Sequence, residues 1–210
     1  MPTKKKDTTI PKLRKEIDTI DDRILDLLIE RAGLVSEVGK LKPRDLGKSI
    51  IRPGREAEMI RRVARKTKGP VSKAAVALIW RLIIASAINI EENAKVSALA
   101  VPGNRECYWL AREYFGAFTE MLQRPTIFEV LQDITDRTAT VGVLPLMHTN
   151  APRTWWSRLT ETKNPPHVFA RVPFIRLAHS QKGSIVAIGH VDPEPTENPT
   201  SGRSWASNLR

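Results

Sequence analysis

The chain has 210 residues, of which 41% are apolar, so it can form one large domain or two small ones and is not disordered throughout. Its net charge of +11 is unevenly spread: residues 1–95 hold 22 basic and 13 acidic side chains, whereas residues 96–210 hold 12 and 10. This difference predicts two regions with different chemistry. A single cysteine, Cys107, excludes an internal disulfide and favours a reducing compartment. No signal segment and no uninterrupted run of roughly 18 apolar residues is found, so we expect a soluble, cytoplasmic protein.

The first region predicts an all-helical domain over residues 11–95, after a disordered basic tail at residues 1–10. Pro11 opens a helix that runs to about residue 41, and further helices are expected over residues 54–66 and 71–93. The first helix carries an apolar seam at spacings of three and four, made of Leu13, Ile17, Ile20, Ile24, Leu27, Leu34, Val38 and Leu41. A helix of about 30 residues rarely closes a core alone, so this seam predicts a partner chain.

One charged residue interrupts the seam, because Arg31 stands where the spacing predicts an apolar side chain. A buried arginine needs an anionic partner, which is either Asp26 or Glu30 on the same helix or an anionic ligand. Lys42 follows eleven residues later, three helical turns on and so on nearly the same face. Arg14 precedes Arg31 by about 25 Å along the helix axis, so it can join the same small site only from a second subunit.

Two further positions combine charge with a special place on a helix. Arg55 and Glu56 lie on the first turn of the second helix, where backbone donors and the positive dipole end are available, although such a pair is common on a helix surface. Glu91 lies near the apolar face of the third helix, four residues after Ala87. A carboxyl group on that face is expected to stay protonated, unless the side chain turns to solvent at the helix end.

Together these residues resemble the AroQ-type chorismate mutases, in which three helices per chain form an intertwined dimer. The resemblance covers residues 10–94 and rests on four blocks in order: Leu13–Asp18 with Ile20 and Asp21, Leu27–Arg31 with Val38–Lys40 and Lys42, Arg55 with Glu56, and Ile79–Arg81 with Ile83, Ile84 and Glu91. It implies the Claisen rearrangement of chorismate to prephenate, with no cofactor, no metal and no membrane or nucleic-acid partner. Such a unimolecular reaction needs cations that hold two carboxylates and donors aimed at the ether oxygen.

The resemblance also implies a site shared between the two subunits of a homodimer. By position, the substrate-binding residues are Arg14, Arg31, Lys42, Arg55 and Glu56, and the catalytic residues are Lys42, Glu91 and Arg31. The arginines bind the carboxylates, with Arg14 supplied by the partner subunit. Lys42 and Glu91 donate to the ether oxygen, and Glu56 accepts from the ring hydroxyl.

Two positions depart from the family pattern, and three alternative functions remain open. Arg52 stands where the family often has an aspartate, and Ala87 where it commonly has a serine, so one hydroxyl acceptor is missing and binding is weaker. An isochorismate-pyruvate lyase could use the same fold and carboxylate clamp. The excess positive charge of residues 1–95 also fits a helical nucleic-acid or partner-binding module, although no recognition helix is visible. A binding protein on a mutase scaffold is the third alternative.

The second region predicts a small α/β domain over residues 96–191, followed by a poorly ordered tail at 192–210. The expected order starts as β-α-α-β, with strands at 96–101, 139–144, 168–175 and 184–190 and helices at 107–118 and 126–134.

This region resembles a worn copy of the prephenate dehydratase catalytic domain. The contact points are Tyr114-Phe115-Gly116, Phe128-Glu129-Val130 and Val141–Pro145. The family's Thr-Arg-Phe motif is missing, and Thr200–Trp205 is at best a broken remnant of it, so we expect a noncatalytic domain. Trp155 and Trp156 are predicted to pack in the core. The four histidines, His148, His167, His179 and His190, are too scattered to predict a metal site.

Overall fold

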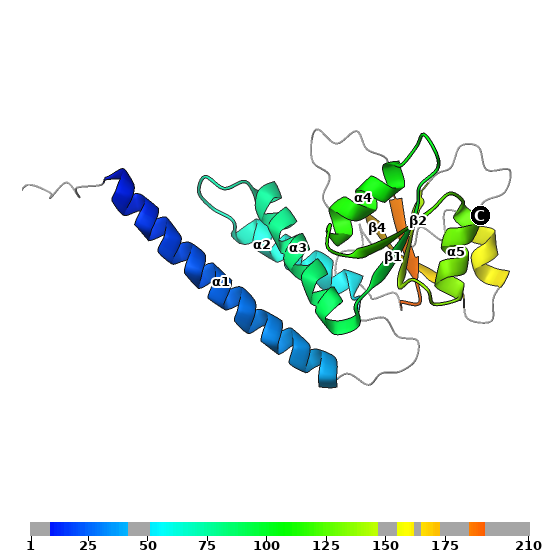
Figure 1. The fold of residues 1–210 in the computed structure, drawn as a ribbon, viewed down its shortest axis with the longest axis horizontal. Coiled ribbons are helices and arrows are strands. Elements are labelled where there is room, and N and C mark those ends of the chain that lie inside the picture. The colour runs from blue at the N-terminus through cyan, green and yellow to red at the C-terminus, as the bar shows by residue number, and fades with distance from the viewer. Residues whose placement is uncertain (1–8, 42–50, 147–154, 162–164, 173–184, 192–210) are drawn as a thin grey trace, which may run out of the picture. The chain divides into compact units, whose positions relative to one another are not determined.

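The computed structural model describes residues 9–41, 51–146, 155–161, 165–172 and 185–191. Two compact units are present, and the division falls between residues 43 and 44. The first unit holds one helix, α1, and the second holds the other helices and the sheet (Figure 1). Each unit is described below on its own.

Helix α1 spans Ile10–Leu41, 32 residues, which confirms the predicted long first helix. None of its residues is buried. The whole apolar seam is exposed, from Leu13 at 44% to Leu41 at 85% of the residue surface. Arg31, which interrupts the seam, is half-buried.

Helices α2 (Pro53–Lys66) and α3 (Lys73–Glu92) confirm the other two predicted helices. Proline at the first position suits the start of α2, since its missing N–H has no partner there in any helix. Ser72 caps α3 by accepting a hydrogen bond from the Ala75 N–H at 3.0 Å. Asn93 ends α3 in the left-handed conformation, with φ of 49°.

Helix α3 is long and apolar enough to cross a membrane by length and composition, with a mean hydropathy of 1.7 in its most apolar window. Core helices of globular proteins meet the same criterion. The buried residues of α3 include Ala77, Ile84, Ala85 and Ile88, and a charged residue, Arg81, lies buried among them. A helix that buries a charge against its own chain is better interpreted as a core helix.

A five-stranded sheet follows α3, in the order β2-β1-β3-β5-β4. Strands β1, β2 and β3 are parallel, and β5 runs antiparallel to both β3 and β4. The elements are β1 Lys95–Leu99, α4 Glu106–Phe115, β2 Glu120–Arg124, α5 Ile127–Thr135, β3 Val141–Pro145, the 3₁₀ helix η1 Trp155–Glu161, β4 His167–Val172 and β5 Ile185–Gly189. The expected small α/β region is therefore present.

The predicted β-α-α-β order is wrong, because β2 lies between the two helices and makes the order β-α-β-α-β. Strand β2 is a short, polar edge strand with the sequence EMLQR and no buried residue, so it lacks the apolar signal of β1 and β3. The helix expected to reach residue 118 ends at Phe115, since Gly116 has φ of +88°. Residues with a Cβ rarely adopt this φ, and a Cβ here would also lie 2.8 Å from the Phe118 ring, so glycine is favoured at this position.

One hydrophobic core joins α2 and α3 to the sheet. Ile60 of α2 and Ile84 and Ile88 of α3 belong to the same buried cluster as Val96 of β1 and Val143 of β3. Trp155 is buried in this cluster and Trp156 packs against it, with the two rings 5.8 Å apart, which confirms their predicted packing role. The packing of α2 and α3 thus continues across residue 95 into the sheet.

A buried acid fixes α5 to two strands of the sheet. The Asp133 carboxylate accepts from Arg124 at 2.7 and 3.0 Å and from the Ser97 hydroxyl at 2.6 Å. Burial by itself raises the pKa of Asp133, but the bonds from Arg124 and Ser97 outweigh it and the net pKa is lowered. The cluster therefore stabilises the folded chain above the ordinary carboxyl pKa, and this stability is lost as the pH falls through the lowered value.

We expect Asp133→Ala to lower the free energy of unfolding by roughly 2–4 kcal/mol at pH 7, because it leaves Ser97 and Arg124 without their acceptor. Urea unfolding measures this change, and the difference from wild type should shrink at strongly acidic pH. Glu120→Gln, which breaks the exposed Lys95–Glu120 pair, is the control and should cost under about 1 kcal/mol. Equal losses in the two variants would contradict the role given to Asp133.

Candidate functional site

The predicted site residues of the first unit lie along α1. Arg14 is exposed near the start of the helix, and Arg31 is half-buried 17 residues later. That spacing corresponds to about 25 Å, so one small ligand cannot touch both side chains of the same helix. Lys42 lies outside the described residues.

The other three predicted residues lie in the second unit. Arg55 is exposed on the first turn of α2, and Glu56 beside it is buried. Glu91 is half-exposed, one residue before the end of α3. The predicted site residues are thus divided between two units, with Arg14 and Arg31 in the first and Arg55, Glu56 and Glu91 in the second.

Glu56 is engaged by a residue that the sequence analysis did not single out as part of the site. Its Oε2 accepts a charge-assisted hydrogen bond from Nη1 of Arg81, which projects from the middle of α3. The Arg81 side chain is 5% exposed and that of Glu56 is 10% exposed. A signal for Arg81 was present in the sequence, since a charged residue four positions after Ala77 and three before Ile84 falls on the apolar face of α3.

Helix α4 completes the surroundings of Arg81. The Arg81 Nε–H donates to the main-chain oxygen of Tyr114 at 2.9 Å. The guanidinium carbon lies 4.0 Å from the centre of the Tyr114 ring, which is a cation–π geometry. Arg81 therefore connects α2 to α4 through one buried side chain.

Burial and the neighbouring groups shift the pKa values of Arg81 and Tyr114. Burial by itself lowers the pKa of Arg81, but its interactions with Tyr114 and Glu56 outweigh that effect and the pKa is raised, so Arg81 remains a cation. Burial raises the pKa of the Tyr114 phenol well above its usual range, so the ring is neutral at pH 7.

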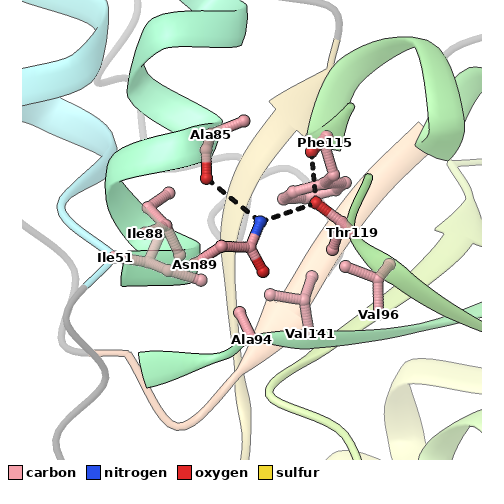
Figure 2. A pocket seen from close by; sticks show the side chains of 9 residues that line it. All are labelled: Ile51, Ala85, Ile88, Asn89, Ala94, Val96, Phe115, Thr119 and Val141. Atoms are coloured by element: carbon pink, nitrogen blue, oxygen red, sulfur yellow. Dashed lines mark hydrogen bonds between the residues drawn. The ribbon is translucent and has the colours of Figure 1, made fainter. Parts of the chain in front are cut away.

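A small cavity lies where α3 meets the sheet, and it is lined by Ile51, Ala85, Ile88, Asn89, Ala94, Val96, Phe115, Thr119 and Val141 (Figure 2). Figure 2 shows the Asn89 amide donating to the Ala85 carbonyl, at 3.2 Å, and to the Thr119 hydroxyl, at 2.9 Å. Thr119 in turn donates to the Phe115 carbonyl. The cavity has space for about one water molecule, so it is a packing feature rather than a ligand site.

The short motifs of the second region have structural roles. Tyr114 supports Arg81, and Glu129 forms a capping box with Thr126 at the start of α5. Val141–Pro145 is strand β3. Each of these features stabilises the fold of the region.

The part of the chain that the structure describes offers little for metal binding or for the chemistry of a reactive thiol. Among those residues, no group of three or more His, Cys, Asp or Glu side chains could hold a metal ion. Burial, with a smaller effect of Glu106, raises the pKa of Cys107 to about 12, so this thiol is not a nucleophile at neutral pH. Burial also lowers the pKa of His190, whose Nε2 bonds the Ile134 carbonyl.

Comparison with known proteins relates the three helices α1, α2 and α3 to a protein family. Residues 13–92 match the family model described as "Chorismate mutase type II". The chain is 33% identical over 144 residues to the bifunctional chorismate mutase/prephenate dehydratase of Aquifex aeolicus, covering 67% of this chain and 39% of that protein. It is 30% identical over 138 residues to the protein of the same name from Pseudomonas aeruginosa, covering 64% of this chain and 38% of that protein. No solved structure matches.

The relatives differ in how much of this chain they match. A stretch of 48 residues is 50% identical to the T-protein of Enterobacter agglomerans, covering 23% of this chain and 13% of that protein. The similarity to the bifunctional proteins is longer than the family match, and only twelve residues precede residue 13, so it extends into the α/β region. The chain spans about two fifths of the length of these bifunctional relatives.

Proposed function

Taking residues 13–92 as a chorismate mutase type II domain, we propose that this chain converts chorismate to prephenate, a step of aromatic amino acid biosynthesis. The observation that carries the proposal is the family match over residues 13–92, which contain all the predicted site residues. The residue types fit the reaction, because a dianionic substrate needs cations and a unimolecular rearrangement needs no nucleophile.

A homodimer with shared sites is part of this proposal. Twelve large apolar side chains of α1 are exposed, and they lie along the whole helix, from Ile10 to Leu41. Four more are exposed on α3, at Leu78, Ile79, Leu82 and Ile90. Helices with this much uncovered apolar surface are typical of a chain that associates, and a second copy carries the complementary seams. The dimer also supplies the Arg14 that cannot reach the site of Arg31 along one helix.

In the proposed mechanism the residues act by position and charge. Arg31 and the partner subunit's Arg14 hold the two carboxylates in the reactive conformer, with Arg55 supporting them. Lys42 and Glu91 donate to the ether oxygen, where negative charge develops as the C–O bond breaks. Glu56 accepts from the ring hydroxyl. All bonds form and break within the substrate.

We propose that the α/β region is a dehydratase-like domain without dehydratase activity. The similarity that extends beyond residue 92 to bifunctional proteins supports the relationship. The Thr-Arg-Phe motif of that family does not occur in residues 96–191. A cytoplasmic location belongs to the same proposal, because the single cysteine is buried and free.

The experiment is a direct assay of the purified full chain with chorismate, following its loss and the appearance of prephenate. Prephenate as the product supports the proposal, and no turnover by a folded dimer overturns it. Isochorismate is assayed in parallel, since pyruvate and salicylate would favour the lyase alternative. Incubation with prephenate tests the α/β region, and phenylpyruvate formation would overturn its noncatalytic assignment.

We expect Glu91→Gln to turn over chorismate faster than wild type at pH 7, because glutamine carries a permanent N–H donor for the ether oxygen, whereas an ionised carboxylate only accepts. Initial rates at a fixed pH of 7 measure the two activities. Glu92→Gln, a change at the exposed neighbour, is the control and should keep the wild-type rate. An equal rate for wild type and Glu91→Gln would assign Glu91 to the solvent-facing end of α3.

A further inference from the structure

We infer that Arg81 is a positioning residue for Glu56, and that helix α4 of the α/β region holds Arg81 in the orientation this requires. The inference rests on the proposed function, because it takes Glu56 as the acceptor for the substrate hydroxyl. It goes further by giving the α/β region a part in the mutase reaction.

The contacts of the pair support a positioning role. Arg81 bonds only one carboxylate oxygen of Glu56, Oε2, so Oε1 is the oxygen left for a substrate hydroxyl. A charge-assisted hydrogen bond to one oxygen limits the positions that the carboxylate can take, because the donors of the planar guanidinium are directional. An acceptor that is fixed before the substrate arrives loses less side-chain entropy on binding.

The orientation of Arg81 itself depends on α4. Its Nε–H and Nη1–H donate to two different acceptors, the Tyr114 main-chain oxygen and the Glu56 carboxylate, so two of the three guanidinium nitrogens are tied to different helices. The Tyr114 ring covers one face of the guanidinium, and Phe115 lies farther off, with its ring centre 5.9 Å away. Glu56 belongs to α2 and Tyr114 to α4, so the predicted mutase acceptor is connected to the α/β region through a single residue.

The Arg81→Lys substitution tests the role of the planar guanidinium without removing the positive charge. Arg81→Lys offers Glu56 a cation but cannot bond the Tyr114 carbonyl and the carboxylate with one planar group. We expect a fall in kcat/KM of about 10- to 100-fold, the cost of a displaced group in an organised site. The matched control is Arg124→Lys, the same change at a second arginine–carboxylate pair, which joins β2 to Asp133 of α5. Its kcat/KM should stay within about twofold of wild type.

Removal of both charges separates positioning from stability. Arg81→Met alone leaves a buried carboxylate without its partner and destabilises the chain, whereas Arg81→Met with Glu56→Met replaces the pair by apolar side chains that are commonly tolerated. We expect the double variant to melt close to the wild-type temperature and still to show the low kcat/KM of Glu56→Met alone. Together with a fall in kcat/KM for the folded Arg81→Lys variant, the absence of any further loss in the double variant indicates that Arg81 acts through Glu56.

Each outcome decides a different question. A stable double variant with wild-type kcat/KM would show that the pair is only structural, and it would overturn the inference while leaving the mutase function intact. Wild-type kcat/KM in a folded Arg81→Lys variant would do the same. A wild-type chain that does not turn over chorismate overturns the proposed function itself, and this inference with it.

Discussion

Replacing Arg31 with alanine is expected to lower turnover of chorismate by about 10²–10³-fold, because it removes a carboxylate contact that also organises the reactive conformer. The helix should survive, since α1 has no buried residue whose packing depends on Arg31. Arg31→Lys should recover little activity, because lysine cannot form the two parallel bonds of a guanidinium with a carboxylate. Steady-state kinetics with circular dichroism and sedimentation measure activity, helix content and dimer mass together.

Arg23→Ala is the matched control for Arg31→Ala. Arg23 is exposed on the same helix and is not among the predicted site residues, so its removal should leave kcat/KM within about twofold of wild type. Near wild-type activity in a dimeric Arg31→Ala variant would return Arg31 to an ion pair with Asp26 or Glu30.

A mixture of two inactive variants, Arg14→Ala and Arg31→Ala, is expected to recover activity after subunit exchange. In a heterodimer, one of the two shared sites receives the intact Arg14 from one subunit and the intact Arg31 from the other. If exchange is statistical, about half of the dimers are heterodimers and about a quarter of all sites are complete. The recovered rate should therefore approach a quarter of the wild-type rate at equal total protein.

Exchange must be shown independently, for example by energy transfer between differently labelled subunits. A mixture of Arg31→Ala with labelled Arg31→Ala protein is the negative control, since no combination of its subunits contains Arg31. Proven exchange without recovery would contradict a site shared between subunits.

The helices of the first region could be predicted because their signals are long and local. The seam of α1 repeats over the whole helix, and Pro53, Ser72 and Asn93 mark helix ends by side-chain chemistry that acts within a few residues. Strand β2 could not, since five residues at a sheet edge need not be apolar and are paired only through β1. Its pairing is a long-range interaction that the local sequence does not encode.

The candidate site shows the same limit. Arg31 and Glu91 were predicted as site residues from their places on helix faces, which a single helix determines. Arg81 was missed as a site residue because its partners lie on two other helices, 25 residues before it at Glu56 and 33 residues after it at Tyr114. A charge on an apolar helix face indicates that a partner exists, but only the tertiary structure identifies it.

The shared core of α2, α3 and the sheet means that the limits of similarity and the limits of folding do not coincide. The family match ends at residue 92, yet Ile84 and Ile88 of α3 are buried in one cluster with Val96 and Val143. A gene fragment that stops after α3 would therefore encode the mutase helices with part of their core uncovered. For recombination or domain exchange, the interchangeable module is not the matched domain: α2, α3 and the sheet must be transferred together.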